Sequence, residues 1–402
     1  METAKGVKDY QPKEQFLREK LLEVATRTYK KYGFNPLQTP IIEREETLTN
    51  KYAGGEEILK EIYTLKDQGK RNLALRYDLT VPLGRYIKEN PEIKLPFKRY
   101  QYGSVFRDGP VKKGRFREFV QCDADVIGNK DLYAEAELLK MMSEIFEELK
   151  LKIKIKYNNI KLLKTVLKNQ GVKNLTSTIL TLDKLEKIGE KGVIKELKEK
   201  KEENPEKIIK AVRNSRKENC EGLRELEEFE NYLKYFDVKV TEFDPTLARG
   251  LAYYTGAVFE AFLVNSEFKS SVAAGGRYDD MIGKLSGRDY PAVGVSFGVD
   301  ATLDAIMKNE QIYIIDVCVI SIKEPKKSIE IANYLRKNNV NTEIILNKNM
   351  KKALSFASHY NVKYSLFVGE EEIKQEKYTL RDMKSGEEKK LSLKEIILQF
   401  NA

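Results

Sequence analysis

The alternation of apolar and polar residues is clearest at residues 98–128. Apolar positions recur at every second residue around 100–106 and again around 119–127, on either side of a basic loop that contains glycine and proline. This pattern predicts a long antiparallel hairpin. The polar positions of the hairpin are the first candidates for a functional site, because strands hold side chains more rigidly than loops do.

Arginine and acidic residues stand at regular places in this hairpin. Arg107 lies at the exit of the first predicted strand, and Arg115 and Arg117 lie at the entry of the second. Arginine binds phosphate and carboxylate groups through paired hydrogen bonds, so an anion site is predicted here. A solvated hairpin with surface charges would show the same alternation. Three polar residues alternate along the second strand and therefore share one face: Gln121, Asp123 and Asp125.

Two strong amphipathic helices are predicted, at 14–31 and at 131–150. Between them, residues 34–42 look extended, and their two prolines confine them to a sheet edge or an irregular strand. A short strand is predicted at 72–76.

Residues 160–235 change in character, since lysine, glutamate and leucine dominate and runs such as KELKEKKEENPEK occur. This composition predicts a helical insertion that Pro205 interrupts. A charged helical segment is typical of a solvated surface, and the lysine excess leaves open a module that faces nucleic acid.

Strand-like alternation returns at 237–264 and at 271–298. From residue 312 onward, the order strand, helix, strand, helix, strand predicts a small α/β domain with a partly parallel sheet. The sequence therefore predicts one domain at 1–310, which contains the helical insertion 160–235, and a second domain at 312–402.

The composition narrows the classes of function. The 402 residues include 72 Lys and Arg against 62 Asp and Glu, and the net charge of +10 favours a polyanionic partner or reflects a lysine-rich proteome. Three distant cysteines and a single histidine, His359, exclude a disulfide framework, a cysteine zinc site and a multi-histidine metal site. Without a signal peptide or a long apolar run, we expect no membrane association and a cytoplasmic protein.

Taken in order, the motifs of this chain resemble those of the histidyl-tRNA synthetases, a family of class II aminoacyl-tRNA synthetases. The resemblance runs nearly end to end, and the region 312–402 resembles the anticodon-binding domain of that family. The other matching stretches are KGVKDYQP (5–12), QTPIIE (38–43, like motif 1), the hairpin 98–128 (like motif 2), LARGLAYYTGAVFE (247–260), AAGGRYDD (273–280) and VGVSFGVD (293–300, in the place of motif 3).

The resemblance implies a fold: an α+β catalytic domain with a six-stranded antiparallel sheet flanked by helices, a helical insertion and a C-terminal α/β anticodon-binding domain. It also implies a homodimer that binds tRNA(His). The implied reaction has two steps. Histidine and ATP, with Mg²⁺ on the phosphates, form histidyl-adenylate, and the histidyl group then passes to the 3′ end of tRNA(His).

The resemblance further assigns arginines to the chemistry. Arg107 and Arg249 match the two family arginines that flank the α-phosphate of ATP, where they would act as catalytic and ATP-binding residues. Arg115 and Arg117 match loop positions that reach the outer phosphates or the acceptor end of the tRNA. Because the carboxylate of histidine is already ionised at pH 7, the first step needs charge stabilisation and no general base.

A histidine pocket is implied in the same way. The α-amino group of histidine is a cation that needs acceptors, and its imidazole has two distinct nitrogens that each need a partner. Ordinary roles remain possible for these positions, since an aspartate can cap a turn and tyrosines are common in strands. The matching residues are Asp78, Thr80 and Gln121 for the α-amino group, and Asp125, Tyr253, Tyr254 and Tyr278 for the imidazole ring.

Three positions depart from the pattern of the family. Gly109 stands where motif 2 often carries an acid, Ala252 replaces an aspartate, and Ala301 stands where motif 3 usually carries an arginine. The outer phosphates of ATP would then depend more on Arg115 and Arg117. Two alternatives stay open: a non-catalytic, histidine-binding regulatory subunit that resembles the synthetases, and an RNA-binding module with a vestigial synthetase core.

Overall fold

The computed structural model describes residues 2–49, 59–111, 116–249, 253–306, 313–346 and 348–401. The chain divides into two compact units. The first comprises Met1–Tyr10 and Leu17–Lys308, and the second comprises Gln11–Phe16 and Asn309–Ala402. Within the described ranges, none of the helices is long and apolar enough to cross a membrane.

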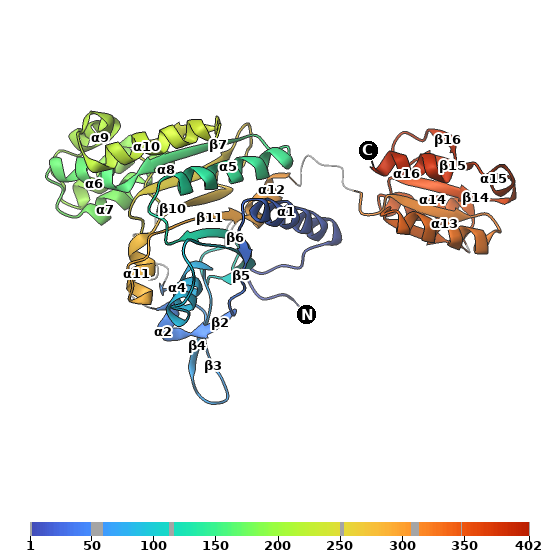
Figure 1. The fold of residues 1–402 in the computed structure, drawn as a ribbon, viewed down its shortest axis with the longest axis horizontal. Helices are drawn as coiled ribbons and strands as arrows, with labels where there is room; N and C mark the ends of the chain where they lie inside the picture. Colours follow the sequence, from blue (N-terminus) through green and yellow to red (C-terminus); the bar gives the residue numbers. More distant parts are fainter. Residues whose placement is uncertain are drawn as a thin grey trace. The chain divides into compact units, whose positions relative to one another are not determined.

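An eight-stranded sheet is the centre of the first unit (Figure 1). The six central strands are antiparallel, as expected, and a short strand is added in parallel at each end. The predicted hairpin is the β5–β6 pair, in register over ten residues. The strands, in spatial order, are β1 (Asn35–Pro36), β5 (Phe97–Phe106), β6 (Glu118–Ile127), β11 (Ala292–Gly298), β10 (Ala273–Arg277), β9 (Ala257–Leu263), β7 (Ile153–Asn159) and β8 (Thr241–Phe243).

Helices cover both faces of this sheet (Figure 1). On one face, the Tyr29 hydroxyl of α1 (Pro12–Lys31) donates to the Cys122 carbonyl at 3.2 Å. On the same side, Phe146 of α5 (Tyr133–Glu148) packs 5.4 Å from Phe297, and α12 (Val299–Ile306) follows β11. The other face carries α4 (Thr80–Glu89) and α11 (Asp279–Ser286), which pack against each other.

The helical insertion leaves the sheet directly from β7 and returns as β8, which pairs in parallel with β7. Its first helix begins sharply, because the Asn159 side chain accepts hydrogen bonds from the backbone N–H groups of Lys161 and Leu162. Pro205 separates two helices by occupying the first position of the second, where its missing N–H costs nothing. The helices are α6 (Ile160–Asn169), α7 (Leu175–Leu182), α8 (Leu185–Glu199), α9 (Pro205–Arg213), the 3₁₀ turn Ser215–Lys217 and α10 (Glu221–Tyr235).

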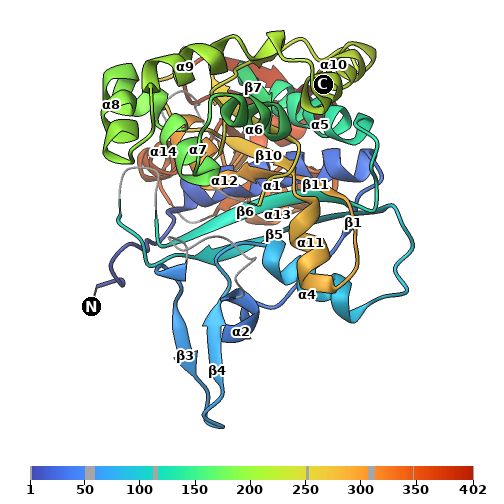
Figure 2. The same ribbon diagram turned by 90° about the vertical axis from the view of Figure 1, so that its left-hand side faces the viewer.

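A smaller sheet of three antiparallel strands projects from the first unit (Figure 2). It consists of β2 (Ile42–Arg44), followed by α2 (Glu45–Leu48), then β4 (Asn72–Leu75) and β3 (Thr64–Lys66), in the order β2-β4-β3. The chain passes from β4 into α4, so the segment around Asp78 connects this small sheet to α4.

The second unit has the α/β alternation expected from its sequence. Its first three strands in spatial order are parallel, and two further strands, which the sequence pattern did not predict, continue the sheet in antiparallel fashion. The order is β13 (Thr342–Ile345), β12 (Val317–Ser321), β14 (Tyr364–Val368), β15 (Tyr378–Asp382) and β16 (Glu388–Leu391), with helices α13 (Pro325–Lys337), α14 (Met350–His359), α15 (Glu370–Gln375) and α16 (Leu393–Asn401).

Candidate active site

One face of the large sheet is polar where β5, β6 and β11 meet. Arg99 is paired in register with Asp125, and Gln101 with Asp123, so their side chains lie on the same face. We call this region the polar floor. It consists of Arg99, Gln101, Gln121, Asp123, Asp125 and Ser296.

Small residues on the neighbouring strands leave space beside the polar floor. Gly294 pairs with Asp125 across β11, and a Cβ atom there would lie 2.0 Å from the Asp125 Oδ1 atom. Gly276 pairs with Gly294 on the next strand, and its Cβ would lie 2.9 Å from the Tyr254 ring. Glycine at these two positions is therefore required by close approach, and larger residues would displace candidate site residues.

Asp125 is the best-connected member of the polar floor. Its Oδ2 atom lies 2.7 Å from the Arg99 Nη2 atom, and its Oδ1 atom accepts a hydrogen bond from the Tyr278 hydroxyl. Arg99 also donates from Nη2 to the Leu79 carbonyl at 3.2 Å. All three side chains of this cluster are buried, with Arg99 0% and Asp125 3% exposed.

Several buried polar atoms of the floor have no hydrogen-bond partner among the described residues. They include the Nε and Nη1 atoms of Arg99, the Oδ1 atom of Asp123, the Oε1 atom of Gln121 and the Oδ2 atom of Asp125, whose contact with Arg99 is an ion pair. The Gln121 amide nitrogen, in contrast, donates to the Ser296 hydroxyl at 3.0 Å. Unsatisfied buried groups are costly, and their concentration at one place indicates a site that a polar ligand or water completes.

Burial shifts the acidic groups of the site toward the protonated form. It raises the pKa of Asp123 to about 7, with the neighbouring charge of Asp125 adding to the rise and Arg99 opposing it. It raises the pKa of Asp78 to about 6, against the opposing effect of backbone N–H groups and Arg107. Burial raises the pKa of Asp125 as well, and Arg99 opposes that rise. This group of buried carboxyl groups makes the site suited to a cationic ligand.

Asp78 and Thr80 lie at the junction between β4 and α4. The Asp78 Oδ1 atom accepts the Val81 N–H at 3.0 Å, so this aspartate does cap the start of the helix. Thr80 is the first residue of α4. Asp78 interacts electrostatically with Asp123 and with Tyr253, which brings the junction close to the polar floor.

The two arginines predicted to be catalytic, Arg107 and Arg249, are far apart in the sequence and have different contacts. The Arg107 Nε atom donates to the Tyr77 carbonyl at 3.0 Å, and its guanidinium lies 5.1 Å from the Phe119 ring centre. The Arg249 Nε atom lies 3.6 Å from a Glu260 carboxylate oxygen, and its guanidinium lies 5.4 Å from the Tyr254 ring centre.

Arg249 is unusual in two ways. Its backbone φ of 49° lies in the left-handed region, which residues other than glycine rarely adopt. Its buried Nη1 atom has no hydrogen-bond partner within the described parts of the chain. Such local strain is often found at functional sites.

Three of the predicted residues form an aromatic wall. The rings of Tyr253 and Tyr254 are 4.7 Å apart, and those of Tyr253 and Tyr278 are 6.1 Å apart at an interplanar angle of 71°. Tyr254 and Tyr278 are buried and Tyr253 is half-buried. Tyr254 interacts electrostatically with both Arg249 and Asp123, so this wall joins the second arginine to the polar floor.

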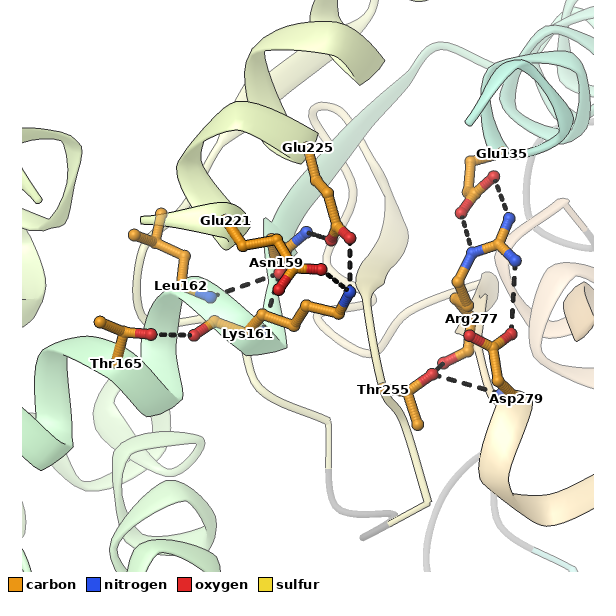
Figure 3. Close-up of polar contacts among 10 residues, drawn as sticks. All are labelled: Glu135, Asn159, Lys161, Leu162, Thr165, Glu221, Glu225, Thr255, Arg277 and Asp279. Carbon is orange, nitrogen blue, oxygen red and sulfur yellow. Dashed lines mark hydrogen bonds and ion pairs between the residues drawn. The ribbon is translucent and has the colours of Figure 1, made fainter. Parts of the chain in front are cut away.

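An ion-pair cluster around Arg277 of β10 lies next in sequence to this wall, and Figure 3 shows Arg277 with Glu135, Asp279 and Thr255. Arg277 binds both carboxylate oxygens of Glu135 at 2.6 and 2.8 Å, the Asn129 carbonyl at 3.0 Å and Asp279 at 3.3 Å. The Thr255 N–H donates to the Arg277 carbonyl at 2.8 Å. Because Tyr278 lies between Arg277 and Asp279, and Tyr254 precedes Thr255, the cluster fixes the backbone on which both tyrosines stand.

The structure brings most of the predicted site residues together. Asp78, Gln121, Asp125 and the tyrosines join Arg107 and Arg249 in one network of contacts and electrostatic interactions. Arg117 is held differently, since its Nη1 atom lies 2.9 Å from Asp108 and its backbone N–H donates to Gly6. Arg115 and Ala252 lie outside the described residues.

The sequence interpretation missed Arg99 and gave no role to Asp123 or Glu260. A signal for Arg99 was available, because it stands eight residues before Arg107 and an even spacing along a strand places both on one face. Its pairing with Asp125 depends on the register of the hairpin, which the sequence pattern leaves undetermined. Glu260 lies in β9 and Arg249 lies before that strand, so no strand periodicity relates the two residues and the sequence offered no comparable signal.

Ala301 stands in the first turn of α12, next to a well-connected acid. The Asp300 carboxylate binds the Arg18 Nε atom at 2.8 Å and accepts the Val120 N–H at 2.8 Å. Arg18, whose guanidinium lies 3.7 Å from the centre of the Tyr10 ring, is thus connected through Asp300 to the start of β6. This acid therefore has a structural task at the end of the polar floor.

Comparison with known proteins matches both units. A family model described as histidyl-tRNA synthetase matches residues 6–302, and a model described as an anticodon binding domain matches residues 316–401. A histidine–tRNA ligase 1 from Bacillus cereus is 43% identical over 416 residues, covering 98% of this chain and 95% of the relative. A histidine–tRNA ligase from Aeropyrum pernix is 35% identical over 420 residues, covering 98% and 96%.

Solved structures share the fold. A histidyl-tRNA synthetase from Nostoc sp. is 29% identical with a TM-score of 0.83, covering 99% of each chain. A protein from Bacillus halodurans, described as an ATP phosphoribosyltransferase regulatory subunit/histidyl-tRNA synthetase, has a TM-score of 0.74 at 20% identity, covering 91% of this chain and 97% of that one. At that identity the likeness concerns the fold alone, so the fold by itself does not separate a ligase from a regulatory subunit.

Proposed function

The chain belongs to the histidyl-tRNA synthetases, a class II family with an anticodon-binding domain, and we propose that its catalysis takes place over the polar floor of the large sheet. As a histidine–tRNA ligase it uses histidine, ATP and tRNA(His). The observation that carries the proposed location is the gathering, among the described residues, of buried polar atoms without hydrogen-bond partners on the polar floor. Asp78 links this floor electrostatically to Arg107, and Tyr254 links it to Arg249.

Formation of histidyl-adenylate needs two anions brought together and the charge at the α-phosphate stabilised. In our proposal, Arg107 and Arg249 supply that stabilisation from two sides. Arg107 is oriented by the Tyr77 carbonyl, and Arg249 is oriented by Glu260 and the Tyr254 ring. Fixed guanidinium groups cost little reorganisation during the reaction, which is why preorganised donors are effective.

The histidine substrate fits the acidic half of the site. Asp78, Thr80 and Gln121 are proposed to receive its α-ammonium group, because the Gln121 Oε1 atom is buried without a partner in the described chain. Asp125 is proposed to accept an imidazole N–H, with Tyr254 at the other ring nitrogen. Tyr253 and Tyr278 would complete the walls. A pocket that hydrogen-bonds both nitrogens rejects rings that lack them.

The outer phosphates of ATP are assigned to Arg115 and Arg117, because Ala301 offers no cation there. Mg²⁺ is proposed to arrive with ATP. Within the described ranges, no group of three or more His, Cys, Asp or Glu side chains is arranged to hold a metal ion. In our proposal the ion would be held mainly by phosphate oxygens, as Mg²⁺ often is.

A homodimer is also proposed. The segment that resembles motif 1 leads to the short edge strand β2, and Ile41, Ile42 and Tyr102 are each 41–49% exposed. Large apolar residues in this number near a sheet edge favour a covered surface. A second copy of the chain fits that role, and measuring the molar mass in solution by light scattering tests it. We also propose a cytoplasmic location, which suits three unpaired cysteines.

Two linked assays test the proposed function. Histidine-dependent exchange of pyrophosphate into ATP reports the first step, and transfer of labelled histidine to tRNA(His) reports the second. A chain ending at residue 306, without the region matched by the anticodon-binding model, should retain exchange and lose most of the charging. Equal losses in both assays by a shortened chain that is still folded would refute this division of tasks, and a full chain that binds histidine without exchange would refute catalysis.

A further inference from the structure

We propose that Arg99 is a positioning residue for histidine recognition: it keeps Asp125 ionised and oriented, so that this carboxylate accepts both the Tyr278 hydroxyl and an imidazole N–H. This inference deepens the proposed function and rests on it, because it takes the polar floor to be the histidine pocket. Arg99 itself need not touch the substrate, since it acts through Asp125.

Among the cations of the described residues, Arg99 is the one that forms an ion pair with Asp125. Its side chain is 0% exposed, and its Nη2 atom is 2.7 Å from Asp125 Oδ2. The neighbouring cation on the same strand, Lys98, faces the other side of the sheet and pairs with Glu137 of α5 at 2.6 Å. The alternation of the strand therefore separates the two cations, one for the pocket and one for the helix layer.

Without Arg99, the acidic groups around Asp125 would raise the free energy of its ionised form. On its own strand stands Asp123, and the segment between β10 and α11 contributes the neutral Tyr278. Asp78, at the start of α4, adds a further acid that acts on Asp123. Arg99 is thus the cation in direct contact with Asp125, while Arg76 acts electrostatically on Asp123 and Asp78.

The protonation state of Asp125 decides which ligand it recognises. An ionised carboxylate only accepts hydrogen bonds, and each oxygen has two lone pairs, so Oδ1 can accept from Tyr278 and still accept an imidazole N–H. A protonated carboxyl would present a donor and lose the charge-assisted bond, which is stronger than a neutral one. Holding Asp125 ionised therefore favours a substrate ring that carries an N–H at this point.

The test is the pH dependence of histidine binding, measured by calorimetry from pH 6 to pH 9 on the full-length protein. An opposite charge in contact lowers the pKa of a carboxyl by about one to three pH units. In Arg99→Gln, the pH above which histidine binds tightly should rise by about that amount, and the Kd at pH 7 should rise about tenfold or more. Arg99→Lys, which retains the charge, should lie between this variant and the wild type.

Two double variants identify the group that titrates. Arg99→Gln with Asp125→Asn should lose the pH shift, because no carboxyl remains there to be protonated. Arg99→Gln with Asp123→Asn should retain it. The opposite pattern would overturn the assignment to Asp125. Lys98→Gln is the matched control, since it removes an ion pair from the same strand on the other face, and it should leave the pH profile unchanged.

A purely structural role for Arg99 gives a different result. Arg99→Gln and Arg99→Lys would then lower the melting temperature as Lys98→Gln does, with the pH profile of histidine binding unmoved, and the inference would fail. Because binding is measured without catalysis, the result is independent of pyrophosphate exchange. An inactive wild type with the expected pH shift would refute the proposed catalysis alone.

Discussion

Two buried arginine–carboxylate pairs lie on opposite faces of the same sheet. On the α5 face, Arg277 binds Glu135 through two hydrogen bonds and also reaches the Asn129 carbonyl and Asp279. On the α4 face, Arg99 binds Asp125 through one nitrogen, and two of its other nitrogens have no hydrogen-bond partner among the described residues. Both pairs are almost entirely shielded from solvent.

The difference between the pairs separates structure from function. A satisfied pair fixes two elements relative to each other, and nothing further can bind to it. An unsatisfied pair costs free energy in the empty protein, and that cost is relieved when a ligand supplies the missing partners. The contrast thus assigns Arg277 to the support of Tyr278 and Arg99 to the pocket itself.

The largest expected effect comes from breaking the satisfied pair. Glu135→Gln removes the bidentate partner of buried Arg277 and leaves only Asp279 at 3.3 Å, and removing one partner of a buried pair typically costs about 3–5 kcal/mol. Urea unfolding of the variant and the wild type measures this loss. A change in unfolding free energy below about 1 kcal/mol would mean that Arg277 does not depend on Glu135.

Arg249→Ala should reduce the rate rather than the stability. Removing one preorganised donor at a transition state typically lowers kcat ~10²–10³-fold. We expect a fall of that size in histidine-dependent pyrophosphate exchange, with a smaller change in the KM for histidine. Ala301→Arg, in contrast, should change the KM for ATP modestly or not at all, because the surrounding side chains have adapted to alanine. A wild type that is inactive until Ala301→Arg is made would contradict this assignment.

Asp125→Asn tests whether the Arg99–Asp125 pair, unlike the Arg277–Glu135 pair, belongs to the histidine pocket. A hydrogen bond to a charged group is worth about 1.5–3 kcal/mol, so histidine affinity should fall about tenfold to hundredfold while ATP affinity changes little. Equilibrium binding of each ligand to the same protein sample measures both numbers. An affinity for histidine within about twofold of the wild type would place Asp125 outside the pocket.

The smallest expected effect is a dependence of the stability of the protein on pH. The folded-state pKa values of Asp78 and Asp123 are about 6 and about 7, above the ordinary aspartate value near 3.9. The folded state therefore binds more protons than the unfolded state between about pH 4 and pH 7, and the stability of the empty protein should fall as pH rises through this window. Thermal melting from pH 5 to pH 8 measures the fall, and Asp123→Asn should reduce it.

Histidine should counteract this loss, because its α-ammonium group is a partner for the ionised acids. The rise in melting temperature on adding histidine should be larger at pH 7.5 than at pH 5.5 in the wild type. Comparison with Asp123→Asn at each pH removes the contribution of the imidazole of histidine itself. If the ligand effect is independent of pH in both proteins, the two acids do not face the ligand.

The sequence by itself determined many of the elements and their order, although it did not predict β15 and β16. Alternation located β5 and β6, amphipathic spacing located α1 and α5, and composition located the helical insertion. These signals are local, since each depends on whether successive side chains meet solvent or core. The motif order also identified the family, and with it most of the residues that the structure brings together.

Only the tertiary structure decided which polar groups are partners. Arg99 and Asp125 are 26 positions apart, and whether they meet depends on the register of a hairpin whose turn the local pattern does not fix. Arg277 and Glu135 are far more distant in sequence, at a separation of 142 residues, and they meet because β10 packs against α5. Burial and satisfaction of hydrogen bonds arise from all surrounding elements at once, which is why the sequence identified the charged residues and the fold decided their roles.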